Sequence, residues 1–577
     1  MEHMGYNKIQ KGQVKKSTLS WLLEEIRGKR WIVVLLTVLQ IMHNTLSVSY
    51  ALIFRDLIDR AVGQQLPGFY SAMIQLVIVV AFQIGIRGIV RYLEEYTRSG
   101  MENILKRRFL DVLLRKPYID VVDVHSGEWM SRMTSDAAVV ADGVTQIVPN
   151  LGGLAVRLLG ALCLIVMLEP KVGLLVMPAG LAFAAVIRLL RLVMKRLHRQ
   201  VQEADAQVRM LLQERLDSQL ILRAYDQQER TGELASEKML QHHRARLRRT
   251  AMSNLNTIGF GMIMQGMYLT GAFVSCLGII QGTVSFGTMT ALLQLIGLLQ
   301  TPLSEFGRYF NQWFAMLASA DRLKEVGQLP EDCDVKKPSV EQAEDFYRRE
   351  FTGIEVDNVS FSYLERGTDA DRTRVTIRNV SLQIHKGEFV ALVGSSGSGK
   401  STLLKLLMGL FTPDSGQIRF LREAPLEPRV PEQGDSALFA YVPQGNQLMS
   451  GTVREVLCWS DPQIMAQDSR LWRALEVACA REFVEQMPGG LDARLGEHGS
   501  GLSEGQIQRL ALARALVSGR PILLLDEATS SLDELTERRV LDNLRTMTGH
   551  TLVLVTHRPR ACEICDRIVQ LKPGAGE

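Results

Sequence analysis

Six long apolar segments constrain this chain more than any other feature. They span Trp31–Phe54, Tyr70–Tyr92, Val144–Leu168, Val172–Val193, Ile258–Ile280 and Phe286–Phe310. Each is close to the roughly 20 residues that a helix needs to cross a bilayer. The first part of the 577-residue chain is therefore predicted to be an α-helical membrane domain with six transmembrane helices. Residues 17–29, before the first span, have the pattern of an amphipathic helix that lies at the membrane interface.

The connections between these segments are of two kinds. Three are short, at residues 61–69, 169–171 and 281–285. Two are long and basic, at about 93–143 and 194–257, and their cations include Lys106, Arg107, Arg108, Lys195, Arg196, Arg199, Arg244, Arg246, Arg248 and Arg249. Because basic connections stay on the cytosolic side, both long connections and both termini are predicted to be cytosolic.

The long connections contain few glycines or prolines, so they are predicted to continue the spans as cytosolic helices rather than to act as linkers. Their tips lie near residues 125–128 and 219–227. We expect these tips to contact the second half of the chain.

Polar side chains interrupt the apolar segments. They are Gln40, Asn44, Gln83, Arg87, Arg157, Gln265, Gln294, Glu305, Arg308 and Asn311. An ionisable group at this depth is costly unless it faces a wet cavity or a partner. We predict a substrate cavity that includes Asn44, Arg157, Gln265 and Gln294. The alternative is pairing between helices or snorkelling, which stays open for Arg157 and is favoured for Arg87 and Arg308 near the cytosolic ends.

Composition excludes several other classes of protein. The net charge of +4 is too small to indicate a nucleic-acid partner, and none is predicted. The N-terminus is polar and rich in lysine, so no signal peptide is expected. The seven cysteines are scattered and odd in number, which is not typical of a disulfide framework. Cys562 and Cys565 form a lone CxxC, which we interpret as packing.

A polar stretch at residues 326–350, with Pro330 and Pro338, is the predicted linker between two domains. The membrane domain would then cover residues 1–325, and a second domain residues 351–577. From Phe351 onward the apolar residues form short β-like runs and then alternate with helical patterns. That order predicts an α/β domain with a partly parallel sheet.

The second domain contains a phosphate-binding loop in the strand–loop–helix context that this motif requires. The loop residues are Gly394, Ser395, Ser396, Gly397, Ser398, Gly399, Lys400, Ser401 and Thr402. Its glycines let backbone N–H groups turn toward phosphate oxygens, and the following helix adds its positive dipole end. Lys400 is expected to reach the β- and γ-phosphates, and the Ser401 hydroxyl to bind Mg²⁺. We therefore predict an α/β P-loop NTPase domain.

Further motifs follow around this loop in a set order. Tyr363, on an early strand, has a ring suited to stacking on adenine. Gln444 ends a strand, where its amide oxygen can bind Mg²⁺ or position water. Residues Leu502–Gln506 open a helix, so Ser503, Gly505 and Gln506 are candidates for an anion site.

The last two motifs supply the candidate catalytic side chains. The apolar strand Ile522–Leu525 ends in two carboxylates, of which Asp526 suits a Mg²⁺ shell and Glu527 suits a general base. His557 ends another apolar strand and is expected to contact the γ-phosphate or the attacking water.

This ordered set resembles ATP-binding cassette (ABC) exporters of the half-transporter type, and the resemblance covers nearly the whole chain. Tyr363 matches the A-loop, Gly394–Thr402 Walker A, Gln444 the Q-loop, Leu502–Gln506 the signature, Ile522–Glu527 Walker B, Ser530–Asp533 the D-loop and His557 the switch histidine. Residues Gly496–Gly499 resemble the X-loop, with His498 in place of a basic residue. Glu504 also departs from the family pattern, which usually has glycine there.

The resemblance implies a mechanism and a set of partners. Two nucleotide-binding domains close head to tail on ATP and Mg²⁺, which turns the spans outward. Lys400, Glu527 and His557 would be the catalytic residues. One chain has one such domain, so a second copy is needed; a homodimer is favoured and a heterodimer stays open. The expected location is a bacterial-type inner (plasma) membrane.

The substrate stays open between two classes at this point. One is an amphipathic small molecule or peptide in a polar cavity, and the other is a lipid. A membrane regulator that binds nucleotide without transport is a third hypothesis. The intact Glu527 and His557 argue against it, because a gate would not need hydrolysis. Like-charge repulsion from the Glu504 carboxylate near the γ-phosphate could weaken closure, but we expect that side chain to point away.

Overall fold

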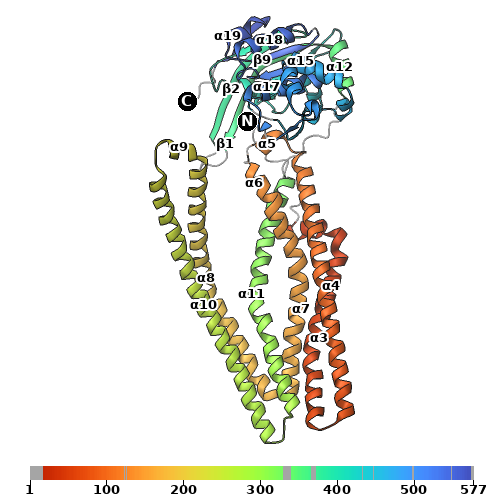
Figure 1. Cartoon of the computed structure of the whole chain (residues 1–577), viewed down its shortest axis with the longest axis vertical. Coiled ribbons are helices and arrows are strands. Elements are labelled where there is room, and N and C mark those ends of the chain that lie inside the picture. The colour runs from red at the N-terminus through yellow and green to blue at the C-terminus, as the bar shows by residue number, and fades with distance from the viewer. Residues whose placement is uncertain are drawn as a thin grey trace. The chain divides into compact units, whose positions relative to one another are not determined.

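The computed structural model describes residues 17–122, 124, 126–328, 339–365, 372–431, 433–445, 448–496, 499–547 and 549–572, without the side chains of 175–177, 179–192, 328, 364–365, 372–374 and 433–434. The chain forms two compact units (Figure 1). The helical unit contains the residues up to Val112 and Trp129–Gln328. The sheet unit contains Leu113–Glu128 and the residues from 329 onward. These units confirm the predicted combination of an α-helical membrane domain and an α/β domain.

Helices of very different lengths make up the helical unit. They are α2 (Thr18–Glu25), η2 (Arg27–Lys29), α3 (Arg30–Val62), α4 (Leu66–Leu113), η3 (Arg132–Asp136), α7 (Ala137–Leu168), α8 (Pro170–Asp217), α9 (Gln219–Ala224), α10 (Gln228–Ile280) and α11 (Phe286–Gln328). Helix α6 (Ser126–Ser131) joins the two units. The predicted helical extensions of the spans are confirmed, because α4, α8 and α10 each continue for 48 to 53 residues.

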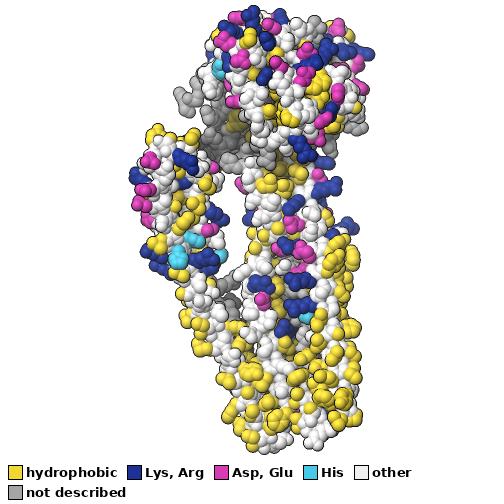
Figure 2. All heavy atoms as spheres, viewed as in Figure 1, with side chains coloured by type: hydrophobic (Ala, Val, Ile, Leu, Met, Phe, Trp, Pro, Cys, Tyr) yellow, Lys and Arg dark blue, Asp and Glu magenta, His cyan; other side chains and the backbone are white. Residues whose placement is uncertain are grey.

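Five helices within the described residues are long and apolar enough to cross a membrane. They contain the predicted spans in α3, α4, α7, α10 and α11. The remaining predicted span, Val172–Val193, lies in α8, where most side chains are outside the described set. The apolar surface agrees with lipid contact, since Ile84 and Phe273 are 68% and 66% exposed. Hydrophobic side chains cover the end of this unit that holds the 62–66 and 280–286 turns (Figure 2).

Helices α3, α7 and α11 form the packed centre of the helical unit. Their core includes Val48, Ile165, Leu292 and Leu295, all buried. Helices α8 and α10 lie side by side, and α9 connects the end of α8 to the start of α10 (Figure 1). An ion pair between Asp136 and Arg322 connects the start of α7 to α11. The buried Asp136 carboxylate accepts hydrogen bonds from Ser319 Oγ and Arg322 Nε, both at 2.8 Å.

The sheet unit is built on two main sheets. An antiparallel sheet has the order β2-β1-β4, and a parallel sheet the order β10-β3-β9-β8-β5. Their strands are β1 (Phe351–Glu365), β2 (Arg372–His385), β3 (Phe389–Val393), β4 (Ser415–Arg422), β5 (Phe439–Val442), β8 (Ile522–Asp526), β9 (Thr551–Val555) and β10 (Arg567–Gln570). Two short strands pair separately, β6 (Gly451–Thr452) and β7 (Arg494–Leu495).

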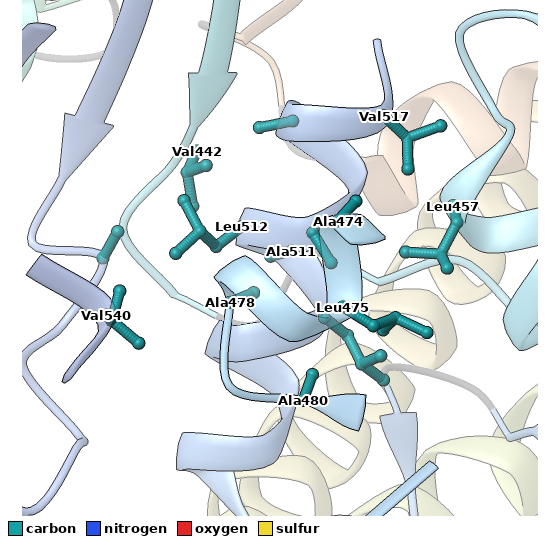
Figure 3. Packing of buried hydrophobic residues seen from close by; sticks show 14 of the residues in the cluster. Val442, Leu457, Ala474, Leu475, Ala478, Ala480, Ala511, Leu512, Val517 and Val540 are labelled. Atoms are coloured by element: carbon teal, nitrogen blue, oxygen red, sulfur yellow. The ribbon is translucent and has the colours of Figure 1, made fainter. Parts of the chain in front are cut away.

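Helices cover these sheets. They are α5 (Tyr118–Val122), α12 (Val340–Arg349), α13 (Lys400–Leu407), η4 (Gln433–Leu438), α14 (Val453–Leu457), η5 (Pro462–Ala466), α15 (Asp468–Val477), α16 (Arg481–Gln486), η6 (Gly490–Asp492), α17 (Glu504–Val517), α18 (Glu534–Arg545) and α19 (Pro559–Glu563). In the core, Leu512 of α17 lies beside Val442 of β5, and Ala511 lies beside Ala474 of α15 (Figure 3). Strands β8 and β9 are buried along their whole length, as in a parallel sheet covered on both faces. The carboxyl ends of these strands therefore meet at one edge, where a ligand site is expected.

Candidate functional site

The phosphate-binding loop runs from the end of β3 to the start of α13, as the sequence predicts. Gly397 and Gly399 have φ of +80° and +86°, which other residues rarely adopt. A Cβ at Gly399 would also come within 2.7 Å of the Ile377 side chain and 2.9 Å of the Thr376 carbonyl oxygen. Position 399 therefore requires glycine for both reasons.

Two polar side chains lie buried inside this loop. Lys400 Nζ donates to the carbonyl oxygens of Gly394 and Ser395, at 2.9 and 3.0 Å. Ser398 is 3% exposed, and its Oγ has no hydrogen-bond partner within the described residues. A buried hydroxyl without a partner is costly, and a phosphate oxygen would supply one. The loop thus fits a phosphate chain, with the Lys400 ammonium free to exchange its carbonyl partners for phosphate.

Asp526 lies at the end of β8, directly beside this loop. Its carboxylate is 2% exposed and accepts hydrogen bonds from Ser401 and, at 3.3 Å, from the Tyr441 hydroxyl. Burial raises the pKa of Asp526, and these two hydrogen bonds oppose that rise. Burial and the Asp526 charge in turn raise the pKa of Tyr441. The paired oxygens of Asp526 and Ser401 are ligands of the kind that a hard divalent cation prefers.

Glu527 follows Asp526 in the sequence, and side chains at the ends of two other strands contact its carboxylate. Gln444 Nε2 donates to Glu527 Oε2 at 2.9 Å, and His557 Nε2 lies 3.4 Å from Glu527 Oε1. Glu527 has φ of +52°, a strained value for a residue with a side chain. Its own N–H donates to the carbonyl oxygen of Val555 at 3.1 Å, which ties the strained residue to β9. The ends of β5, β8 and β9 thus bring the three predicted side chains together.

Tyr363 lies at the other end of the loop. Its hydroxyl is 3.3 Å from Thr402 Oγ1, so the ring stands over the start of α13. The ring packs edge-on against Phe411 and Phe361, with centroids 5.7 and 5.2 Å away. Sequence reasoning missed Phe411, because nothing in its local sequence marks it as a neighbour of Tyr363.

The residues predicted for the signature form a separate group. Ser503 caps α17: its Oγ accepts from the Gln506 N–H, and its own N–H donates to Gln506 Oε1. Gly505 faces the Ser530–Asp533 segment, since an added Cβ would lie 3.0 Å from the Ser531 carbonyl oxygen. Ser503 and Gly505 line a pocket of about 500 Å³ together with Glu504, Arg509 and Asp533.

Within the described residues, no hydrogen bond joins the signature group to Lys400, Glu527 or His557. Glu504 is exposed at the rim of its pocket. Glu497 and His498 of the predicted X-loop lie outside the described residues, as does His125 at the tip of the first long connection.

The predicted cavity residues have different environments in the helical unit. Asn44 is 9% exposed, its Nδ2 donates to the Gln40 carbonyl oxygen at 2.8 Å, and it packs against Gly153 of α7. Gln294 Oε1 and Arg157 Nε are buried and have no partner within the described residues. Gln265 is exposed.

Arg157 lies near Arg87 and near His43, a residue that the sequence analysis did not single out. The imidazole of His43 on α3 lies within electrostatic reach of Arg87 on α4 and Arg157 on α7. No carboxylate contributes to the surroundings of His43 or Arg157 within the described residues. We call the two cations Arg87 and Arg157, together with the nearby His43 imidazole, the membrane cation cluster. His43 could have been predicted from the sequence, because one face of α3 carries polar residues at helical spacing: Gln40, His43, Asn44 and Ser47.

Comparisons with known proteins agree with both units. The family model of the ABC transporter transmembrane region matches residues 33–303, and that of the ABC transporter matches residues 377–530. An ATP-dependent lipid A-core flippase of Chromobacterium violaceum is 30% identical over 94% of this chain and 91% of its own. The flippase of that name from Bordetella avium is 28% identical over 91% and 87%.

A solved structure has the same fold across nearly the whole chain. It is a bacterial Atm1-family ABC exporter with ATP bound, with a TM-score of 0.74, 20% identity and coverage of 95% of this chain and 94% of that one. The phosphate-binding loop, the helical unit and these likenesses lead to one conclusion. The chain belongs to the ABC transporter family, as an exporter-type half-transporter that couples ATP hydrolysis to transport across a membrane.

Proposed function

We propose that this exporter moves an anionic amphiphile, namely a lipid with a phosphate or carboxylate headgroup. The membrane cation cluster is the observation that carries the proposal. Arg157 Nε is buried without a partner, and no carboxylate balances the Arg157 charge within the described residues. An uncompensated cation at membrane depth costs roughly 2.5–3.5 kcal/mol. An anionic headgroup would offset that cost and gain charge-assisted hydrogen bonds.

The neighbouring amides hold the cluster in place. Gln40 Nε2 donates to Asn150 Oδ1 at 2.9 Å, which links α3 to α7 one turn from His43 and two turns from Arg157. Asn44 packs between the same two helices. We therefore assign Asn44 to support of the site, and Arg157 and His43 to headgroup binding. The names of the relatives from Chromobacterium violaceum and Bordetella avium favour a lipid over a peptide.

The ATPase roles follow from the geometry at the strand ends. Lys400 would leave the Gly394 and Ser395 carbonyls for the β- and γ-phosphates, and Tyr363 would stack on adenine. Ser401, Asp526 and Gln444 would hold Mg²⁺, which neutralises phosphate charge when bound. Glu527 would take a proton from water as its oxygen attacks the γ-phosphorus and the bond to the ADP oxygen breaks. His557 and Gln444 orient that carboxylate.

Two observations support a homodimer. Ser503 and Gly505 are not joined to the phosphate-binding loop by any hydrogen bond of the described residues, so a second copy would bring its signature to this ATP. The α9 tip also exposes Leu220 and Tyr225, by 82% and 73%. The sheet unit carries a mostly apolar groove of about 700 Å³ with Met449 and Trp459 in its lining. We propose that the α9 tip of one copy docks in this groove of the other.

The proposed location is a bacterial inner membrane, with both termini and the sheet unit in the cytosol. The support is the basic charge of the two long connections, because such segments stay on the cytosolic side. ATP is also supplied from that side.

Proteoliposomes test the substrate class. The probes are nitrobenzoxadiazole-labelled phosphatidylglycerol and phosphatidylcholine, and the readout is their ATP-dependent transfer between leaflets. We expect faster transfer of the anionic lipid, and about tenfold slower transfer of it by Arg157→Gln, since a hydrogen bond to a charged group contributes about 1.5–3 kcal/mol. Arg107→Gln is the matched control, because Arg107 is 87% exposed.

Equal transfer of both lipids, or an unaffected Arg157→Gln variant, would contradict the proposal. Enrichment of a peptide or small molecule in inside-out vesicles, without lipid transfer, would support the other substrate class. ATP binding without any transport would favour the nucleotide-gated regulator.

A further inference from the structure

The segment Leu113–Glu128 lies between two long helices in sequence but belongs to the sheet unit by its contacts. Ile119 packs against the core formed by β1, β3 and α13. The ring of Tyr118 stacks on Phe411, with centroids 6.0 Å apart and planes at 26°. A segment continuous with α4 and α6 thus has an aromatic contact with the nucleotide-binding domain.

Phe411 connects that contact to the candidate adenine site. It is 3% exposed and stacks face to face on Phe361, with centroids 5.1 Å apart and planes at 2°. It also meets Tyr363 edge-on, at 5.7 Å and 90°. Tyr118, Phe411 and Tyr363 therefore form a continuous series of ring contacts, which we call the aromatic ladder.

Lys405 adds a charge to the same ladder. Its Nζ lies 5.9 Å from the Tyr118 ring centroid and 5.6 Å from that of Phe411. Lys405 sits on α13, one turn after Lys400, and its charge also acts on Asp526. Movement of Tyr118 would thus change the surroundings of a cation at the nucleotide site as well as those of a ring.

We infer that Phe411 is a positioning residue for ATP: it transmits the placement of Tyr118 to the Tyr363 ring and so sets the affinity for adenine. Tyr118 is 41% exposed, so burial of its own ring does not account for its contact with the buried Phe411. The coupling is reciprocal, because any change in ATP affinity caused by the segment implies an equal effect of ATP on the segment.

The test uses the full-length protein in nanodiscs, with ATPase kinetics and equilibrium binding of a fluorescent ATP analogue. We expect Phe411→Leu and Tyr118→Leu each to raise the KM and the dissociation constant for ATP by roughly three- to tenfold, with kcat within about twofold, as lost ring contacts predict. Tyr118→Phe keeps the ring and should behave as wild type. The double Leu variant should be no worse than either single one, since both break the same series.

Phe346→Leu is the matched control, because Phe346 packs on Phe351 and Phe420 instead of Tyr363. It should leave the KM unchanged. If Phe411→Leu fails to fold, the partly exposed Tyr118 still gives the test through its Leu and Phe variants. A fall in kcat at constant KM, additive effects in the double variant, or a Tyr118→Leu variant with wild-type KM would overturn the inference.

Discussion

The nucleotide site and the membrane cation cluster treat buried polar groups in opposite ways. At the nucleotide site most functional side chains are paired within the chain: Lys400 with two carbonyl oxygens, and Glu527 with Gln444 and His557. In the cluster, Arg157 Nε and His43 Nδ1 are buried without a partner in the described residues. The first site is assembled before its ligand arrives. The second carries a cost that an anionic occupant would remove.

The two sites therefore differ in the ligand property that determines their specificity. The nucleotide site must exchange internal bonds for bonds to ATP, so only a ligand that satisfies all of them gains free energy. The membrane cation cluster gains free energy from any anion that reaches its depth in the membrane. That makes the headgroup charge, rather than a detailed shape, the feature that the membrane site recognises.

The largest expected effect is at the preassembled site. Glu527→Gln should bind ATP but lose at least about 10²-fold in turnover, because the amide cannot accept a proton from water. Phosphate release and equilibrium ATP binding by the purified protein measure the two quantities. Glu534→Gln, an exposed carboxylate at the start of α18, is the control. Near-normal hydrolysis by Glu527→Gln would remove Glu527 from the catalytic group.

Substitution in the membrane cation cluster should raise the stability of the protein while it lowers transport. Arg157→Met should stabilise the helical unit by roughly 2 kcal/mol, since it removes an uncompensated cation, while it abolishes transfer of anionic lipid. Thermal unfolding in detergent and the proteoliposome assay give the two readouts. A lower unfolding midpoint would mean that Arg157 already has a partner, and the comparison between the two sites would fail.

A smaller effect is expected for the adenine platform. Tyr363→Ala should weaken ATP binding by about tenfold, because aromatic stacking on a base contributes about 1–3 kcal/mol. Tyr363→Phe should keep most of the affinity, since the ring remains and only the contact with Thr402 is lost. Isothermal calorimetry in the Glu527→Gln background separates binding from turnover. Unchanged affinity in Tyr363→Ala would mean that another side chain stacks on adenine.

The smallest effect concerns Glu504. Glu504→Gly removes an exposed carboxylate from the signature pocket, and we expect ATPase activity to rise by no more than about threefold. The difference should shrink at high salt, because exposed charges are screened. ATPase rates at about 0.05 M and about 0.5 M salt measure both points. A large and salt-independent increase would show that Glu504 blocks closure sterically.

The sequence predicted that the candidate nucleotide-site residues lie close together, for a physical reason. Parallel strands end at one edge of a sheet, so the positions of Gln444, Asp526, Glu527 and His557 after apolar runs were enough to bring them together. Phe411 and His43 were missed because their partners, Tyr363 and Arg157, lie far away in sequence and follow no local spacing. The place of Asn44 in a cavity stays a prediction; its amide donates within α3, a choice between neighbours that hydropathy does not encode.

The inward bonds of Lys400 have a consequence for a cell that runs short of energy. Because loop carbonyls already satisfy the ammonium group, the empty loop needs no nucleotide to keep its order. Proteases that cut at the start of α13 should therefore attack the nucleotide-free protein slowly, and ATP should slow them further, because a ligand that binds only the folded state stabilises it. A cell without ATP would keep its transporters intact and idle until ATP returns.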